Sequence, residues 1–380
     1  MDDSIVIELS PVQTRDGAFA ASTQVNFDRK ISAYERQLAA EPGDITALDG
    51  LGYCLSRSGR HQEALAIYSR LLRRKSDAPG IWCNYGTVLE QLGYYSEAVE
   101  IYKRALVVSP GYFKAMYGKS KNLYRLDRYK EALASYDRTL AISQSYDLWY
   151  GRAKVLTKLN RLDEAVESFE QALQINPRSA KVWASLGQAL MYQQKNEAAI
   201  AKFDQALTLS PDYALCWTYK GFLLKRLSYH TEALGCFDQA TQIEPSVASA
   251  WHHRGLTLMN LQRYQEAYDS FKAALQCQAY DHKSWLCLGW ALEKMGDYTQ
   301  AIEAYNKSLS IEPDQSFAFY RQARCYALLE NMGSAMEYWR RAMALHPEIY
   351  QQRALTDPVL QSVQAKALLA EAASATTAPS

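Results

Sequence analysis

The sequence predicts an all-α protein, a right-handed solenoid of about nine tandem helical hairpins with capping helices at both ends. Three observations point to this fold. Tryptophan recurs every 34 residues, proline recurs in the same register, and alanine holds one fixed place in every repeat. A period of roughly 20–50 residues is typical of repeat proteins, in which each unit buries its apolar faces only against its neighbours.

The period is set by five tryptophans and one further aromatic residue, at Trp149, Trp183, Trp217, Trp251, Trp285 and Phe319. Proline follows the same spacing, with Ala279 in the one missing place, at Pro177, Pro211, Pro245, Pro313 and Pro347. Placing tryptophan at position 4 divides the chain into repeats 1 to 9, at residues 45–78, 79–112, 113–145, 146–179, 180–213, 214–247, 248–281, 282–315 and 316–349.

Small and aromatic residues predict two packed helices in each repeat. Positions 4, 7, 8 and 11 share a face of the first helix, and positions 20, 24, 27 and 28 share a face of the second. Position 8 is small and position 20 is alanine throughout, so the two backbones can approach closely, while an aromatic ring at position 24 fills the space beside them. Proline near position 32 ends the second helix.

The pattern resembles the tetratricopeptide repeat family, whose repeat reads W-x2-L-G-x2-Y, then A-x3-F and a final P. Trp183 to Gly187 and Trp285 to Gly289 match it best, and the resemblance covers about residues 45–349. It implies a protein that binds other proteins. One departure is a basic or polar residue at position 7, whose stem should pack while its head reaches water; it occurs at Lys119, Arg152, Lys220, Arg254 and Gln322. Repeat 3 is one residue short, which predicts a local change of twist.

Both ends of the repeat array are expected to carry capping helices. Residues 27–44 fit a lone second helix, with Tyr34 at position 24. Residues 350–371 form the C-terminal cap: a helix ends near Thr356, and Asp357 and Pro358 then begin a second segment. Residues 1–26 and 372–380 are expected to be disordered tails, although residues 5–9 could instead form a docking strand.

Composition excludes several classes of function. A net charge of +1 argues against nucleic-acid binding. The seven scattered cysteines form no C-x-x-C pair, so a cytoplasmic protein without structural zinc is expected. Adjacent His252 and His253 point about 100° apart on a helix, so they form a poor metal pair with Cys287. No catalytic motif, signal peptide or membrane-spanning stretch appears, and we expect no enzyme activity, metal, cofactor or membrane insertion.

The resemblance implies that first helices line a concave groove through positions 2, 5, 6, 9, 12 and 13. In repeats 3 to 6 these positions carry many bases and aromatic rings but a single acid, Asp147. A basic groove attracts anionic partners, so an acidic or aromatic-bearing extended segment is the expected ligand. The predicted binding residues are Lys114, Tyr117, Lys121, Tyr124, Arg125, Tyr150, Lys154, Lys158, Lys181, Tyr192, Tyr219, Phe222, Lys225 and Arg226.

Repeats 7 to 9 are more apolar at the same positions. Trp290 is the expected interface anchor, and the C-terminal helix or a second copy of the chain could cover it. The predicted apolar groove consists of His252, His253, Trp290 and Tyr320. A carboxylate clamp of the kind used by chaperone-binding family members is incomplete: Asn84 and Lys114 fit it, but Asp49, Tyr53 and Gly118 do not.

Taken together, the residues favour a stand-alone scaffold, adaptor or assembly factor that holds a protein partner. One alternative is a regulatory subunit that positions a catalytic partner within an enzyme or defence complex. A second alternative, an RNA-binding helical repeat, is disfavoured by the near-neutral charge and the many tyrosines.

Overall fold

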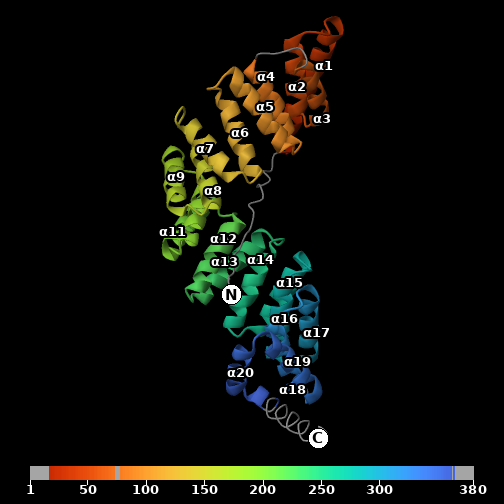
Figure 1. Ribbon diagram of the computed structural model, residues 1–380, viewed down its shortest axis with the longest axis vertical. Helices are drawn as coiled ribbons and strands as arrows, with labels where there is room; N and C mark the ends of the chain where they lie inside the picture. The colour runs from red at the N-terminus through yellow and green to blue at the C-terminus, as the bar shows by residue number, and fades with distance from the viewer. Residues whose placement is uncertain (1–16, 73–77, 362, 364–380) are drawn as a thin grey trace, which may run out of the picture. The chain divides into compact units, whose positions relative to one another are not determined.

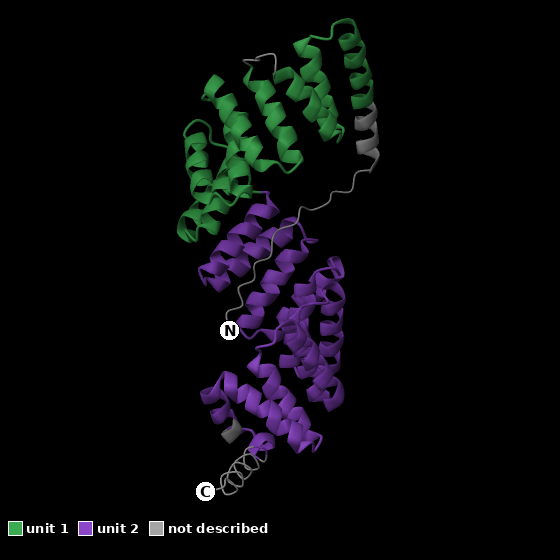
Figure 2. Cartoon of the chain, turned by 45° about the vertical axis from the view of Figure 1, so that its right-hand side comes forward, with its two compact units in different colours: residues 1–177 green, residues 178–380 purple. Residues whose placement is uncertain are grey.

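The computed structural model describes residues 17–72, 78–361 and 363, and over these residues the chain is helical and contains no β-strand. The predicted all-α fold class is confirmed. The chain divides into two compact units, unit 1 at residues 1–177 and unit 2 at residues 178–380, which Figure 2 shows in different colours.

Unit 1 consists of a leading helix followed by helical hairpins, seen in the red to yellow part of Figure 1. Its helices are α1 (Gly17–Ala40), α2 (Ile45–Arg57), α3 (His61–Leu72), α4 (Pro79–Gln91), α5 (Tyr95–Val108), α6 (Phe113–Arg125), α7 (Tyr129–Leu140), α8 (Tyr146–Lys158) and α9 (Leu162–Ile175). Helix α7 in the short repeat 3 has 12 residues, whereas α5 and α9 have 14 each.

Unit 2 continues the hairpins and ends on a terminal helix, in the green to blue part of Figure 1. Its helices are α10 (Ala180–Tyr192), α11 (Asn196–Leu209), α12 (Ala214–Arg226), α13 (His230–Ile243), α14 (Ala248–Asn260), α15 (Tyr264–Cys277), α16 (His282–Met295), α17 (Tyr298–Ile311), α18 (Ser316–Leu328), α19 (Met332–Leu345) and α20 (Pro347–Thr356).

Each first helix packs on the second helix of its own repeat and on the first helices of adjacent repeats in the same unit. In unit 1 the first helices α2, α4, α6 and α8 touch in sequence, and in unit 2 the helices α10, α12, α14, α16 and α18 do the same. We call these two layers the first-helix face of unit 1 and the first-helix face of unit 2.

Close contact between the two helices of a repeat depends on glycine at position 8 and an aromatic ring at position 24. A Cβ on Gly255 would lie 2.6 Å from the Phe271 ring, and one on Gly289 would lie 2.6 Å from the Tyr305 ring. The rings at position 24 are buried in every repeat, and the alanine at position 20 is fully buried. These side chains form the core that the sequence predicts.

The turn between the two helices of each repeat has a left-handed residue at position 15, which the sequence analysis missed. Glycine supplies it in three repeats, but non-glycine residues have φ between 56° and 66° in the others. These residues are Gly59, Gly93, Asp127, Asn160, Gln194, Ser228, Gln262, Gly296 and Glu330. Side chains other than glycine are strained in this region.

The tryptophans at position 4, which share a face of the first helix with the small residue at position 8, are only half-buried. Their indole nitrogens donate to nearby acceptors, as Trp217 does to the Pro211 carbonyl oxygen at 2.9 Å. A cation lies over most of these rings, as Lys307 Nζ lies 4.4 Å from the Trp285 ring centre. Each indole is therefore placed between the hairpin core and solvent, where it can use both its apolar face and its N–H group.

Side chains at position 7 are also placed differently from the prediction. Their heads do not simply reach water but bind position 25 of the preceding repeat, with donor–acceptor distances of 2.6 to 2.7 Å. The pairs are Arg152 with Asp137, Lys220 with Asp204, Arg254 with Asp238 and Gln322 with Asn306. Lys119 has no such partner among the described residues. We call this series of contacts the position-7 ladder.

The N-terminal boundary differs from the prediction because α1 begins at Gly17, within the residues 1–26 that were expected to be disordered. Residues 17–26 contain no proline, and three alanines favour helix. Farther along α1, the Tyr34 ring lies where a Cβ on Gly50 would approach it to 2.4 Å, so α1 covers α2 as a second helix covers its first. Residues 1–16, including the alternative docking strand, lie outside the described residues.

At the C-terminus, residues 350–371 do not form one helix. Helix α20 ends at Thr356, and Asp357 caps a following helical segment by accepting a hydrogen bond from Val359 N at 3.1 Å. Residues 364–380, which include the predicted second tail, lie outside the described residues. Within the described chain, none of the helices combines the length and hydropathy that a bilayer crossing requires.

Candidate functional site

The predicted basic groove residues fall on two separate first-helix faces. Unit 1 contributes side chains from α6 and α8, and unit 2 contributes side chains from α10 and α12. In unit 1, Lys114, Arg125 and Lys158 are exposed, and no carboxylate among the described residues pairs with Lys114 or Lys158. These cations are therefore available to an anionic group from outside the chain.

Lys121, by contrast, is already paired. Its ammonium forms an ion pair with the carboxylate of Glu90 on α4, which also accepts a hydrogen bond from Asn122 Nδ2 at 3.1 Å. Glu90 stands at position 12 of repeat 2 and Lys121 at position 9 of repeat 3. The acids of repeats 3 to 6 alone do not reveal this compensating charge, because it comes from the preceding repeat.

Aromatic rings position the other bases of this face. Lys154 Nζ lies 4.6 Å from the ring centre of Tyr124 and 5.9 Å from that of Tyr150. The Arg125 guanidinium lies 5.1 Å from the Tyr95 ring centre and donates a hydrogen bond of 3.0 Å to Tyr95 Oη. A cation held over a ring keeps its full charge while losing conformational freedom.

The tyrosines of unit 1 differ in what they offer a ligand. Tyr150 is buried, with its ring 6.0 Å from that of Phe169, so it supports the face from below. Tyr117 and Tyr124 are half-buried. Burial, with a contribution from the Asp147 carboxylate, raises the pKa of Tyr117 to about 12, so its hydroxyl remains a hydrogen-bond donor at neutral pH.

On the first-helix face of unit 2, one amide links two of the predicted tyrosines. Gln188 Nε2 donates to Tyr192 Oη at 3.2 Å and to Tyr219 Oη at 3.1 Å. Tyr192 is exposed, whereas Tyr219 is buried and stacks on Phe203. Lys181 and Arg226, on the same two helices, are exposed.

Residues of the predicted basic groove and of the predicted apolar groove meet around His253, whose side chain is buried, with 6% of the residue exposed. Phe222 packs on the imidazole with a ring separation of 5.4 Å, and Lys225 Nζ lies 3.5 Å from His253 Nδ1. Burial, reinforced by the charge of Lys225, lowers the pKa of His253 well below its ordinary value. His252 is half-buried, and its Nδ1 lies 2.8 Å from Ser284 Oγ.

Trp290 is half-buried, and an arginine lies over its ring. The Arg321 guanidinium lies 4.9 Å from the ring centres of both Trp290 and Phe317. Arg321 and Arg324 converge on Glu293, whose carboxylate is buried and also accepts a hydrogen bond from Tyr305 Oη at 3.0 Å. Glu293 was not among the predicted residues, although its position 12 against Arg324 at position 9 repeats the Glu90–Lys121 register.

Tyr320 is not open to a partner, because the C-terminal segment covers it. Its hydroxyl donates to Asp357 Oδ2 at 2.8 Å, and its ring stacks on Tyr350 of α20 at 5.4 Å. Arg324 forms an ion pair with the same Asp357 carboxylate. The chain thus supplies its own acidic group to this part of the first-helix face of unit 2.

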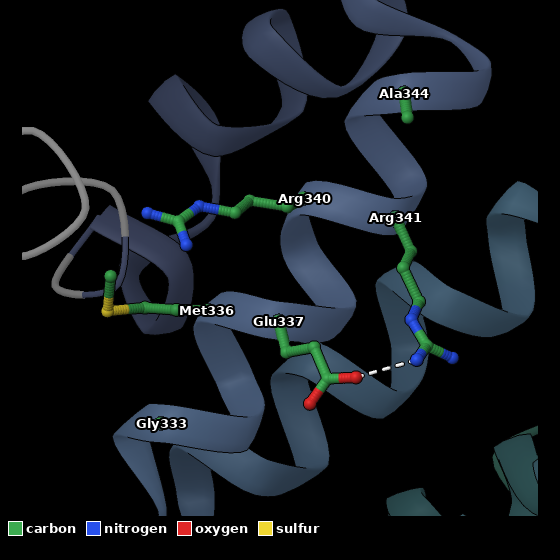
Figure 3. A pocket seen from close by; sticks show the side chains of 6 residues that line it. All are labelled: Gly333, Met336, Glu337, Arg340, Arg341 and Ala344. Carbon is green, nitrogen blue, oxygen red and sulfur yellow. Dashed lines mark hydrogen bonds and ion pairs between the residues drawn. The ribbon is translucent and has the colours of Figure 1, made fainter. Parts of the chain in front are cut away.

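The described surface carries a hollow on each unit. One, of about 450 Å³, is lined by α19 side chains, with Glu337 paired to Arg341 at 2.6 Å (Figure 3). Another, of about 540 Å³, borders the position-7 ladder at Trp149 and Arg152. No group of three or more potential metal ligands gathers anywhere in the part of the chain that the structure describes.

Family models identify the class of protein. Models of the tetratricopeptide repeat match residues 20–79, 84–147, 150–214, 224–282, 282–315 and 317–348. The chain belongs to the tetratricopeptide repeat family, as its sequence pattern predicts. The fold is, in general terms, that of a protein-interaction scaffold. No curated protein matches the sequence.

Solved structures share the fold at low sequence identity. The C-terminal part of a repeat-containing protein from Cytophaga hutchinsonii has a TM-score of 0.52 and 16% identity, over 61% of this chain and 95% of that one. YrrB, described as a TPR protein with an unusual peptide-binding site, has a TM-score of 0.47 and 22% identity, over 50% of this chain and all of that one. PilF from Pseudomonas aeruginosa has a TM-score of 0.49 and 18% identity, over 58% of this chain and 97% of that one.

Proposed function

We propose that the chain is a scaffold or adaptor that binds an extended acidic segment of a partner protein on the first-helix face of unit 1. The observation that carries this proposal is the arrangement on α6 and α8. Lys154 lies over the Tyr124 ring, and Lys114 and Lys158 on the same two helices are exposed without a carboxylate partner from the described chain. Fixed cations beside half-buried rings favour a ligand with both acidic and aromatic side chains.

Only some of the predicted bases should contribute strongly to binding of an acidic segment. Lys121 contributes less than its position suggests, because Glu90 neutralises it. Bases held by rings, or exposed without a carboxylate partner, should supply most of the attraction. The proposed contact residues are therefore Lys114, Tyr117, Tyr124, Arg125, Lys154 and Lys158.

Charge reversal tests the proposal with a defined probe. A short fluorescein-labelled peptide of Asp and Phe, and its counterpart of Asn and Phe, are titrated against the full chain while anisotropy is measured. The acidic peptide should bind the wild type and lose at least about tenfold in affinity to the triple variant Lys114→Glu, Lys154→Glu, Lys158→Glu, which is about 1.4 kcal/mol. Added salt should weaken the binding.

The matched control reverses three exposed bases away from the first-helix faces, at Lys130, Lys195 and Lys272. This variant has the same net charge as the triple variant and should bind the acidic peptide almost as the wild type does. An equal loss of affinity in both variants would show that net charge, and not the first-helix face of unit 1, controls the binding. Unchanged binding in the triple variant, or tighter binding of an RNA oligonucleotide than of the acidic peptide, would overturn the proposal.

A further inference from the structure

The contacts of the position-7 ladder recur in the same form. Each joins a side chain on the first helix of one repeat to a side chain on the second helix of the preceding repeat. In repeat 7, Arg254 donates to Asp238 of the preceding repeat and to Ser270 of its own repeat, each at 2.6 Å. The same two contacts recur in unit 1 in the set Arg152, Asp137 and Ser168. A base at position 7 is thus normally held by a carboxylate at position 25 and, where present, a serine at position 23.

Lys119 in repeat 3 lacks both contacts. Position 25 of the preceding repeat is Lys103, so a second cation stands where an aspartate faces the bases Arg152, Lys220 and Arg254. Position 23 of its own repeat is Ser135, whose Oγ accepts a hydrogen bond from Ser120 Oγ at 2.8 Å. No carboxylate among the described residues forms an ion pair with Lys119, although this side chain is half-buried.

The surroundings of Lys119 are cationic. Burial lowers the pKa of its ammonium, and the charges of Arg138 and Lys103 lower it further. The neighbouring acids are already engaged: Glu131 binds Arg128 at 2.7 Å, and Glu100 binds Lys103 at 2.7 Å. A half-buried amine among like charges is stabilised by any anion that can reach it.

We infer that Lys119, with Lys103 and Arg138, forms a binding site for a carboxylate side chain of a protein partner, on the ladder side of unit 1. A carboxylate is the group expected because the other three bases at position 7 each pair with an aspartate in the corresponding place, namely Asp137, Asp204 and Asp238. A partner's aspartate or glutamate would supply the carboxylate that Lys119 lacks among the described residues. This site is separate from the first-helix face, because position 7 is not among the groove-lining positions.

Acetylation kinetics can test the site one residue at a time. The full chain is treated with a low concentration of an acetyl succinimidyl ester at fixed pH, and mass spectrometry follows Lys119 and Lys220 separately. The reagent attacks the neutral amine, so Lys119 should react several-fold faster than Lys220, which is paired to Asp204. A short aspartate peptide should slow the reaction of Lys119 and leave that of Lys220 unchanged, relative to chloride at equal ionic strength.

The variant Lys103→Asp closes the ladder from within the chain. It should slow acetylation of Lys119 without any peptide and remove the further protection by the peptide, whereas Lys103→Met, which removes one cation of the site but adds no carboxylate, should weaken that protection without removing it. Protection should also persist in the triple variant Lys114→Glu, Lys154→Glu, Lys158→Glu, which separates this site from the proposed first-helix face. The assignment would be overturned if the peptide left the acetylation rate of Lys119 unchanged. It would also be overturned if inorganic phosphate slowed that rate more than the aspartate peptide does.

Discussion

The guanidinium of Arg254 donates a 2.6 Å hydrogen bond to Asp238 and so joins the first helix of repeat 7 to the second helix of repeat 6. The repeat pattern alone would predict a packed side chain at position 7, where Arg254 stands, and an exposed one at position 25, where Asp238 stands. Since a repeat protein is stabilised by contacts between neighbours, this pair couples two adjacent hairpins directly.

Removal of this pair should weaken the coupling between the two repeats. Arg254→Met and Asp238→Asn should each lower the free energy of unfolding. The double variant should lower it by less than the sum of the two single effects. Because Asp238 is about half exposed, a coupling free energy of about 0.5–1 kcal/mol is expected from urea unfolding. Independent, additive effects would show that the ladder contact contributes nothing.

Two glycine-to-alanine substitutions should change the stability in opposite directions, because only one of the glycines, at position 8, packs against a ring. In Gly255→Ala the new methyl group would meet the Phe271 ring, so a loss of about 1–3 kcal/mol is expected. Gly235→Ala is the control, because nothing lies within 4 Å of a Cβ at this helical position. It should gain about 0.5–1 kcal/mol through helix propensity. Thermal unfolding followed by circular dichroism checks both, and Phe271→Leu should relieve the first variant in part.

The turn residues at position 15 offer a stabilising change. Gln262 has φ of 59°, a conformation that costs a residue with a Cβ about 1–2 kcal/mol. Gln262→Gly should therefore raise the melting temperature, while Gly296→Ala, at φ of 87°, should lower it. If glycine at position 262 destabilises the protein, the left-handed turn is not the source of strain.

The repeat architecture could be predicted from sequence because it depends on local, periodic requirements. An alanine such as Ala267 and an aromatic residue such as Phe271 recur wherever two helices must pack closely, so both leave a readable pattern. The charge pairs were harder to foresee. Glu90 and Lys121 are 31 residues apart and belong to different repeats. Their pairing depends on how one first helix is placed on the next, which composition at single positions does not reveal.

Burial within the candidate site could not be predicted for a similar reason. Tyr219 and His253 stand at positions that the family pattern assigns to a groove, but Phe203, Phe222 and Phe237 enclose them in this chain. Tyr320 is covered because a single carboxylate, that of Asp357, binds it from the C-terminal segment. Such contacts depend on the size of neighbouring side chains and on the path of the chain end.

The contact between Asp357 and Arg324 predicts a pH-dependent stability. Burial alone would raise the pKa of Asp357, but the hydrogen bonds from Arg324 and Tyr320 outweigh it and hold the pKa below the ordinary value. A carboxyl group whose pKa is lower in the folded state stabilises the fold above its unfolded pKa. This contribution is lost as the pH falls through the folded pKa.

Asp357→Asn should therefore destabilise the wild-type fold by about 1–3 kcal/mol at neutral pH, because buried donors lose their charged acceptor. The difference between wild type and variant should shrink as the pH falls below about 4. Melting temperatures measured across this range check the prediction. A difference that stays constant with pH would show that Asp357 is not held as the carboxylate.

The most direct test of the proposed function is the place where an acidic peptide binds. The Asp and Phe peptide, carrying a benzophenone in place of one Phe, is irradiated with the full chain, and cross-linked residues are located by mass spectrometry. Cross-links should fall on α6 and α8, at Tyr117, Tyr124 and their neighbours, and an excess of unlabelled peptide should suppress them. Cross-links confined to the second helices of unit 1, or to unit 2, would contradict the account.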